Sequence, residues 1–518
     1  MQRRENMTIH WIDAIILILY ALGMVGIAVY TRNRTKTVED TLHAGKKGLN
    51  GWMSAFAYGT TYFSAVIFIG YAGKFGMQYQ MASVWIGIGN ALLGSLLAWK
   101  IIAKRTKNMT QRLQAKTMPD FFEKRYGSKG LKLTSAVIIF IFLIPYSASV
   151  YNGLSNLFEI VFKIDAWIVM VALSIITAIY LFFGGYFATA LSDFIQGIIM
   201  LIGVVLMVIS FCNYDAVNWD FSKLNWFTFS SENKGIYGDT VSLISLILLT
   251  SLGVMGLPQT VHKYYSVRDK KAINQGMIVS TLFALIIGFG AYFVGGLYSK
   301  YAPTGIFDSN PDNNIPYMLK LVIKPGLLGV IAVLILSASM STLSSVSLSG
   351  ASVLAIDIYK GSIDKEASDK KVNVLLRVLC VVFIAISLLL AFLNMKFKLT
   401  AIAYLMGLSW GTLAGCFTGP FVVGLITKKV TKTACWWSII SSLVLTCVLI
   451  VLLGYGKADF NCSFGVAIKN GMTCSPLIGV ICIAFSIVIT LIVSRFTKPL
   501  DEKIIYESFD KKIENEII

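Results

Sequence analysis

The amino-acid sequence predicts an all-α, polytopic membrane protein. Hydrophobic residues make up 56% of its 518 residues and charged residues only 14%, and the mean hydropathy of +0.72 lies outside the range of ordinary soluble domains. Apolar windows of about twenty residues, the length that crosses a bilayer as a helix, recur along the whole chain. We therefore expect about thirteen membrane-spanning helices.

The thirteen expected spans follow one another at short intervals, with ends defined to about 2–4 residues. They lie near residues 12–30, 52–75, 81–103, 131–161, 166–184, 190–212, 241–262, 273–298, 326–359, 373–394, 400–426, 434–455 and 474–494. We do not expect the first span to be a cleavable signal peptide, because its apolar core is too long and the basic stretch TRNRTKT follows it.

The Lys and Arg residues alternate between two sets of connecting segments. One set carries 30 of the 45 Lys and Arg residues and the opposite set carries 12. The basic set comprises residues 31–51, 103–133, 263–272, 360–372, 427–433 and 495–518. Because cytoplasmic loops carry the excess of positive charge, we expect the N-terminus outside and the C-terminus inside. The net charge of +18 then faces anionic lipid and does not indicate a nucleic-acid partner.

Enzymatic chemistry is not expected. The three histidines (His10, His43 and His262) all lie outside the deep parts of the spans, and no loop is long enough to hold a catalytic domain. No cysteine motif resembles a metal site, although a disulfide between Cys462 and Cys474, near the same external loop, remains open. A transporter or a channel is what remains.

Two spans contain residues that interrupt a helix. The second span carries Gly59, two threonines and Ser64 at its middle, and the seventh carries Gly253, Gly256 and Pro258 near its inner end. These spans are five apart and run in opposite directions, as the first helices of two inverted repeats do. Discontinuous helices favour a carrier over a passive channel. The alternative is that the glycines only allow close helix packing.

The ninth span contains the stretch SASMSTLSSVSLSGAS, which holds eight serines and one threonine in sixteen residues. Na⁺ is a hard cation that takes oxygen ligands. Ser341, Ser344 and Ser345 are spaced i, i+3 and i+4, so they share one helix face. This pattern indicates a sodium site; the alternative is that the hydroxyls bond to their own helix and allow close packing.

Asp193 lies about one turn inside the sixth span. A charged residue at that depth costs ~2.5–3.5 kcal/mol on insertion scales unless it has a partner. No Lys or Arg lies in the neighbouring apolar stretch, so a bound cation is the partner that we expect. The alternative is that Asp193 reaches the inner membrane interface and is solvated there.

The stretch ASMSTLSSVSLSGASVLAIDIYK resembles the signature of the sodium:solute symporter family. The resemblance extends to TTYFSAVIFIG, GGYFATALSDFIQG and GLPQTVHKYYSVRD, and so covers nearly the whole chain. It implies the LeuT-type fold, with a 5+5 inverted repeat, one leading helix and two trailing helices. The implied parts are an external N-terminus, leading helix and first cytoplasmic loop (1–51), a first repeat (52–212), a second repeat (213–426), two trailing helices (427–494) and a cytoplasmic tail (495–518).

The resemblance also implies two sets of sodium ligands. The main site draws on backbone carbonyls and hydroxyls from the second and ninth spans, at Thr60, Phe63, Ala338, Ser341 and Thr342. The second site, which some members of the family have, adds a carboxylate and comprises Asp193, Ser341, Ser344 and Ser345.

The substrate is constrained by departures from the family patterns. Tyr62 stands where proline symporters have an aspartate, and Ile67 stands where galactose members have a polar amide. The helix 131–161 lacks, in its apolar part, the arginine that sialic acid members use. The stretches MPDFFEKRYGSKGLK and IFLIPYSASVYNG are most similar to pantothenate-type and related members. The candidate substrate residues are Thr61, Tyr62, Ser64, Ile67, Tyr146 and Tyr151.

Taken together, these features predict a sodium-coupled secondary active symporter that imports a small organic solute by alternating access. The solute is an organic acid, pantothenate-like or amino-acid-like; the alternatives are a sodium-coupled sialic acid, proline or sugar symporter, or a passive channel. Na⁺, the solute and membrane lipid are the expected partners. We expect a monomeric, multi-pass protein of the plasma membrane.

Overall fold

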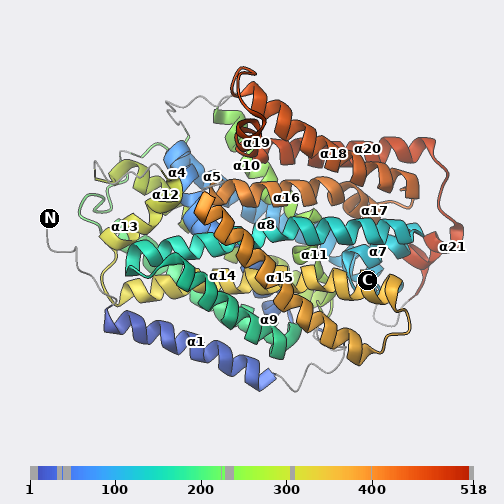
Figure 1. The fold of residues 1–518 in the computed structure, drawn as a ribbon, viewed down its shortest axis with the longest axis horizontal. Coiled ribbons are helices and arrows are strands. Elements are labelled where there is room, and N and C mark those ends of the chain that lie inside the picture. Colours follow the sequence, from blue (N-terminus) through green and yellow to red (C-terminus); the bar gives the residue numbers. More distant parts are fainter. Residues whose placement is uncertain are drawn as a thin grey trace.

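The computed structural model describes residues 10–31, 38, 48–222, 224–227, 239–303, 310–397 and 400–512. This part of the chain is helical throughout, apart from connecting segments and an isolated bridge between Leu49 and Val267. The long helices run roughly alongside one another (Figure 1). The start of α1 (Trp11–Thr31) lies at one end of the bundle and α21 (Glu502–Ile505) at the other.

Most long helices run singly through the bundle. Besides α1 they are α8 (Lys129–Phe162), α12 (Lys270–Tyr301), α14 (Leu327–Ser352), α15 (Asp369–Phe397), α16 (Ile402–Thr418), α18 (Lys432–Gly456) and α20 (Ser475–Phe496). The shorter helices are α5 (Val84–Gly89), α6 (Lys104–Leu113), α7 (Met118–Tyr126), α13 (Asn314–Val322), α17 (Gly424–Ile426) and α19 (Phe464–Met472).

The element α9 (Ala166–Cys212) contains two spans, Ala166–Gly185 and Ala188–Cys212. They meet at Gly185, whose φ of 59° and ψ of −166° form a conformation that is essentially restricted to glycine. This bend lies between the expected spans 166–184 and 190–212 and confirms both.

Both interruptions predicted from the sequence are present. The helix α3 (Gly51–Tyr62) ends at Phe63, which is extended, and the chain becomes helical again before the π-helical turn η2 (Ile67–Tyr71) and α4 (Ala72–Tyr79). The helix α10 (Asp239–Leu252) passes through the 3₁₀ turn η6 (Gly253–Gly256) into α11 (Pro258–Tyr265), with a bend of 49°.

The exact count of thirteen spans is not confirmed. In the described part of the chain, 11 helices are long and apolar enough to cross a membrane, or up to 12 if the bent pair α10 and α11 is one span. The difference arises at residues 52–75 and 81–103. Because α3 ends at Phe63, the remainder of the second span joins the third in one helical run, Ile67–Leu113, which leaves helical geometry at Gln80 (φ 51°).

Close helix packing, which was the alternative explanation for the glycines, explains glycines that lie outside the two interruptions. A Cβ placed on Gly295 of α12 would lie 2.2 Å from the Ala72 carbonyl oxygen, and one on Gly87 would lie 2.7 Å from the Gly288 carbonyl oxygen. These helices are therefore in direct backbone contact, as small residues allow in membrane proteins.

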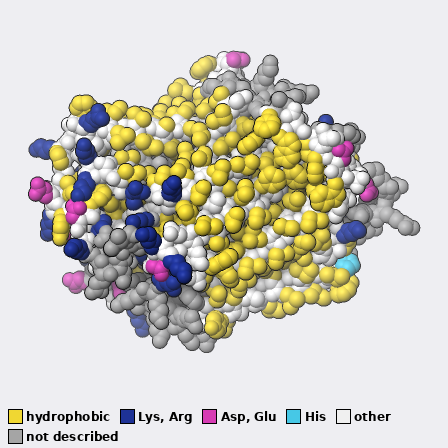
Figure 2. Space-filling model, turned by 180° about the vertical axis from the view of Figure 1, so that it is seen from behind, with side chains coloured by type: hydrophobic (Ala, Val, Ile, Leu, Met, Phe, Trp, Pro, Cys, Tyr) yellow, Lys and Arg dark blue, Asp and Glu magenta, His cyan; other side chains and the backbone are white. Residues whose placement is uncertain are grey.

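The outer surface carries a broad apolar area (Figure 2). Exposed apolar side chains include Leu22, Ile202 and Leu389. Lys and Arg side chains gather at the left end of this view, which is the end of Figure 1 where α7 and α21 lie. The apolar surface together with the long apolar helices is that of a multi-pass membrane protein.

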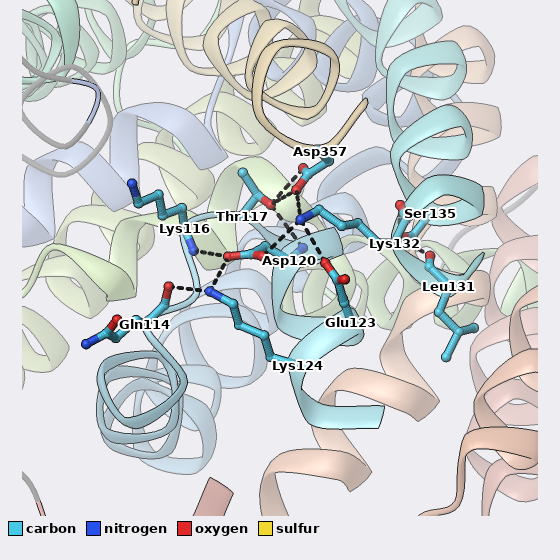
Figure 3. A network of polar contacts seen from close by, with 10 residues as sticks. All are labelled: Gln114, Lys116, Thr117, Asp120, Glu123, Lys124, Leu131, Lys132, Ser135 and Asp357. Atoms are coloured by element: carbon cyan, nitrogen blue, oxygen red, sulfur yellow. Dashed lines mark hydrogen bonds and ion pairs between the residues drawn. The ribbon is translucent and has the colours of Figure 1, made fainter. Parts of the chain in front are cut away.

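A buried polar network, here called the Asp357 cluster, ties three elements together at that end (Figure 3). Asp357 lies on η8 (Val353–Ile363), which continues α14, and both of its carboxylate oxygens are within 2.8 Å of Thr117 Oγ1. Lys132 Nζ lies 3.1 Å from Asp120 Oδ1, 2.9 Å from Glu123 Oε2 and 3.7 Å from Asp357 Oδ1. One ammonium group of α8 therefore neutralises carboxylates of α7 and η8.

The charges of this network lower the pKa of Asp120, which lies on α7 outside the spans. Burial alone would raise this pKa, but Lys132 and Lys124 together with the Lys116 N–H group outweigh burial and hold the pKa below its usual value. The carboxylate of Asp120 is therefore stabilised in its charged form.

At the opposite end, Asp312 of the turn η7 (Pro311–Asn313) is buried and accepts a 3.0 Å hydrogen bond from the Ile402 N–H group. Nearby, Lys74 Nζ lies 3.7 Å from the centre of the Tyr404 ring. Burial raises the pKa of Asp312 to about 6, against the opposing effects of the Ile402 N–H group and of Lys74.

We predict that Lys132→Met strongly destabilises the protein, because it leaves buried carboxylates without their ammonium partner, a loss that costs about 3–5 kcal/mol. Lys124→Met is the matched control: Lys124 also contacts Asp120, at 3.0 Å, but its side chain is 36% exposed, against 10% for Lys132. Thermal unfolding in detergent should show a large drop for the first variant and a small one for the second. Equal drops would contradict the central role of Lys132.

A second prediction concerns pH. Because the pKa of Asp312 is higher in the folded protein than in the unfolded chain, folding takes up a proton, and the resulting stability is present below about pH 4 and lost as the pH rises through about 6. Lowering the pH from 7 to 4.5 should therefore shift the melting temperature of the wild type upward relative to that of Asp312→Asn, by about 1–2 °C or more. Parallel pH profiles for the two proteins would show that Asp312 does not titrate in this range.

Candidate functional site

The interruption after α3 frees backbone carbonyl groups inside the bundle. The last carbonyls of a helix have no N–H partner within that helix, and here they are those of Thr60 to Phe63. The Ser64 hydroxyl accepts a 3.2 Å hydrogen bond from the Val66 N–H group and so caps the start of the next helical turn. Carbonyl oxygens are therefore available in the interior without loss of the neighbouring helices.

The hydroxyl groups of α14 meet these carbonyls. Ser341 Oγ lies 3.1 Å and Thr342 Oγ1 lies 3.3 Å from the Thr60 carbonyl oxygen. Ser341 Oγ is also 3.2 Å from the Ala338 carbonyl oxygen. Four of the five positions expected for the main sodium site thus converge in one buried cluster, here called the Thr60 cluster: Thr60, Ala338, Ser341 and Thr342.

Phe63, the fifth expected position, lies at the interruption itself. Its N–H group donates to the Gly59 carbonyl, and its ring stacks on that of Tyr62 with 4.5 Å between the ring centres. Phe63 is therefore three residues beyond Thr60, at the extended position that follows α3.

The donor set of the Thr60 cluster suits a hard, singly charged cation. It consists of carbonyl and hydroxyl oxygens, and the hydroxyl hydrogens can rotate so that lone pairs face a cation. Because these ligands are neutral, a cation bound here is not held by an opposite full charge, and it can be released again. This is what a co-transported ion requires.

Other hydroxyls of α14 bond to their own helix, as the alternative explanation predicted. Ser339 Oγ donates to the Ile335 carbonyl at 2.8 Å, and Ser352 Oγ donates to the Ser349 carbonyl at 2.8 Å. Ser344 Oγ likewise donates to the Ser341 carbonyl at 2.9 Å. The serine-rich stretch therefore combines self-bonded positions with the few that reach another helix.

The expectation that Asp193 has no charged side chain as a partner is wrong. Its side chain is fully buried, and Oδ2 lies 3.2 Å from Lys263 Nζ. The same ammonium group donates to Ser345 Oγ at 3.0 Å. Burial also excludes the alternative in which Asp193 reaches the membrane interface.

Sequence reasoning missed Lys263 because it placed this residue in the basic loop 263–272. In the structure α11 continues to Tyr265 after the bend, and Lys263 is only 3% exposed. Pro258 at the first turn of α11 is the signal that could have revealed this, since proline is favoured where a helix begins.

The members of the second expected sodium set make separate contacts in the structure. Ser341 belongs to the Thr60 cluster and Ser344 bonds within its own helix, whereas Ser345 contacts Lys263. Ser345 Oγ also lies 2.8 Å from the hydroxyl of Thr61, which we expected to face the substrate.

A small cavity of about 20 Å³ lies beside the interruption of α3 and is lined by Tyr62, Ser64 and Ile67 from the expected substrate set. A volume of this size holds about one water molecule. The cavity is therefore too small for an organic solute in this arrangement of the helices.

Several residues that line this cavity were not expected from the sequence: Asn90, Thr250, Tyr292 and Trp410. Of the two other expected tyrosines, Tyr146 packs edge-on against Trp410, with 5.7 Å between the ring centres, and Tyr151 is buried elsewhere on α8. Asn90 is an amide in an otherwise apolar stretch, and this is the signal that could have identified it.

Hydrogen bonds tie both interrupted helices together at the cavity. Tyr62 donates to the Thr250 carbonyl at 2.7 Å, and Thr250 Oγ1 donates to Asn90 Oδ1 at 2.7 Å. Among the described residues that line the cavity, none carries a charge.

The two cysteines for which a disulfide remained open, Cys462 and Cys474, are both free thiols in the structure. Cys474 precedes α20 and is largely buried, whereas Cys462 lies in the segment before α19 and is partly exposed.

Comparisons with known proteins agree with this architecture. The osmoregulated proline transporter OpuE of Bacillus subtilis is 27% identical over 470 residues, which cover 89% of this chain and 92% of that protein. The sodium/proline symporter of Haemophilus influenzae is 28% identical over 429 residues, covering 80% and 83% of the two chains. The outward-open structure of a Na⁺-coupled sialic acid symporter superposes with a TM-score of 0.75 at 19% identity, covering 95% and 98%, and shows the same fold.

The sequence model of the sodium:solute symporter family matches residues 43–442. This match covers most of the chain and includes both interrupted helices, the Thr60 cluster and Asp193. The protein therefore belongs to the sodium:solute symporter family.

Proposed function

We propose that the protein imports a small solute of amino-acid type together with Na⁺, and that Na⁺ binds at Thr60, Phe63, Ala338, Ser341 and Thr342. The observation that carries this proposal is the Thr60 cluster, where hydroxyls of α14 meet a carbonyl freed by the end of α3. These oxygens come from two helices that can move apart, so ion binding favours the arrangement in which the helices are together.

The chemistry of the cavity supports a solute without net charge. No charged side chain lines it among the described residues, so an anion such as an organic acid would lack a cationic partner there. A zwitterion can instead place its two charged groups at the ends of the interrupted helices, whose dipoles attract opposite charges. The named relatives that transport proline, also a zwitterion, agree with this class.

The small size of the cavity and the polar contacts at the two ends of the bundle support alternating access. The Asp357 cluster joins helices at one end, and Asp312 holds the start of α16 at the other. Opening one end at a time would connect the cavity to one side of the membrane. We propose that the end with the Asp357 cluster faces the cytoplasm of a protein in the plasma membrane, because Lys and Arg gather there (Figure 2). The N-terminus would then lie outside.

We predict that uptake of a zwitterionic amino acid into proteoliposomes needs an inward Na⁺ gradient. One Na⁺ moving across ~100 mV and a tenfold gradient supplies ~2.3 + 1.4 kcal/mol, enough to concentrate a neutral solute several-hundred-fold. The screen should include proline, other amino acids and pantothenate, each with Na⁺ and with K⁺. Equal accumulation in K⁺, or equilibration without accumulation as through a channel, would refute the proposal.

The Thr60 cluster is tested by two serines of the same helix. Ser341→Ala removes the hydroxyl group that lies 3.1 Å from the Thr60 carbonyl oxygen. Ser339→Ala removes a hydroxyl group that donates to the Ile335 carbonyl of its own helix. Both side chains are buried. We expect the first variant to raise the half-saturating Na⁺ concentration about tenfold or more, and the second to leave it near the wild-type value. Similar shifts would mean that these hydroxyls serve packing.

A further inference from the structure

Lys263 stands where the second sodium site was expected. Its Nζ contacts two of the four groups of that set, Asp193 Oδ2 at 3.2 Å and Ser345 Oγ at 3.0 Å. The lysine and aspartate side chains are only 3% and 0% exposed. The ammonium group therefore occupies the position of a cation, bound to a carboxylate and a hydroxyl in the interior.

The charges at this position are already balanced. Asp193 contributes one negative charge and Lys263 one positive charge, so a sodium ion added between them would have to stand beside an ammonium group with no second carboxylate to hold it. In the region that the structure describes, no group of three or more Asp, Glu, His or Cys side chains is placed so that it could hold a metal ion.

The Lys263 ammonium group is also connected to both interrupted helices. Lys263 lies on α11, directly after the bend of the second interrupted helix, and Asp193 lies on α9. Ser345 on α14 connects the ammonium group to Thr61 at the end of α3, through a 2.8 Å contact between the two hydroxyls. Four helices that pack against one another, α3, α9, α11 and α14, thus meet at one lysine.

We propose that Lys263 replaces the second sodium ion, so that the protein binds one Na⁺, in the Thr60 cluster, and holds its second cation as a permanent part of the chain. This inference rests on the proposed sodium-coupled function and determines its stoichiometry. The positive charge that links α9, α11 and α14 then remains bound throughout the transport cycle, whereas the ion in the Thr60 cluster binds and dissociates in each cycle.

The test is direct binding of radioactive sodium to the purified, full-length protein in detergent. The wild type should saturate at one Na⁺ per protein with a Hill coefficient near one. Two Na⁺ ions per wild-type protein would overturn the inference and leave the sodium-coupled function intact. No sodium binding at all would overturn the proposed function itself, so the two failures are distinguishable without any variant.

Variants then identify the lysine. Lys263→Met removes the ammonium group but keeps the length of the side chain, and should expose Asp193 to a second Na⁺, so that binding rises to two ions per protein. The double variant Lys263→Met with Asp193→Asn should return to one. A folded, monodisperse Lys263→Met protein that still binds one ion would overturn the inference.

Lys107→Met is the matched control. Lys107 is another buried lysine close to the end of α11, but its Nζ donates to the Tyr265 carbonyl at 2.8 Å. Its removal should leave the count at one Na⁺, and a rise to two would show that the effect is not specific to Lys263. If Lys263→Met does not fold, Lys263→Arg keeps the positive charge and should bind one Na⁺; binding of two would contradict the proposal.

Discussion

Every backbone N–H and carbonyl group inside a membrane needs a partner, and the interior of this protein depends on this constraint. An intact helix meets the requirement by itself, but α3 ends at Phe63 in the middle of the bundle. The Thr60 carbonyl is then satisfied by hydroxyls of α14. The serine-rich helix is thus required by the interruption, and the interruption is tolerated because of the serine-rich helix. Their meeting point is a set of neutral oxygens that a sodium ion can use.

The same constraint applies to charged groups in the interior, two of which contact side chains of opposite charge. Asp193 is accompanied by Lys263, and Lys132 stands among the carboxylates of the Asp357 cluster. The first contact joins α9 with α11, and the second joins the consecutive helices α7 and α8 to η8, which is distant in the sequence. Because separation of such a pair leaves a buried charge without a partner, these contacts define discrete arrangements of the bundle. A transporter that opens its two ends in turn needs such discrete states.

The lining of the cavity shows how the substrate site depends on the positions of several helices. Its lining comes from both interrupted helices and from residues such as Asn90 and Trp410 that lie far away in the sequence. The cavity has room for about one water molecule, and its lining among the described residues is largely aromatic, with one amide and no charged side chain. Solute specificity therefore resides in side chains that several helices bring together.

The sequence by itself determined the all-helical membrane architecture and both helix interruptions, and its resemblance to the sodium:solute symporter family implied the residues of the Thr60 cluster. The architecture and the interruptions are local features, because hydropathy over twenty residues and glycine and proline within a span can be read from neighbouring positions. Only the tertiary structure decided that Asp193 pairs with Lys263, that Thr61 turns toward Ser345, and that Asn90 lines the cavity. It also decided that the second expected span breaks after α3, so that its remainder and the third expected span form a stretch that is interrupted at Gln80. The physical reason is that the direction in which a helix continues after a bend, and hence the partner that a side chain meets, is set by packing against helices hundreds of residues away.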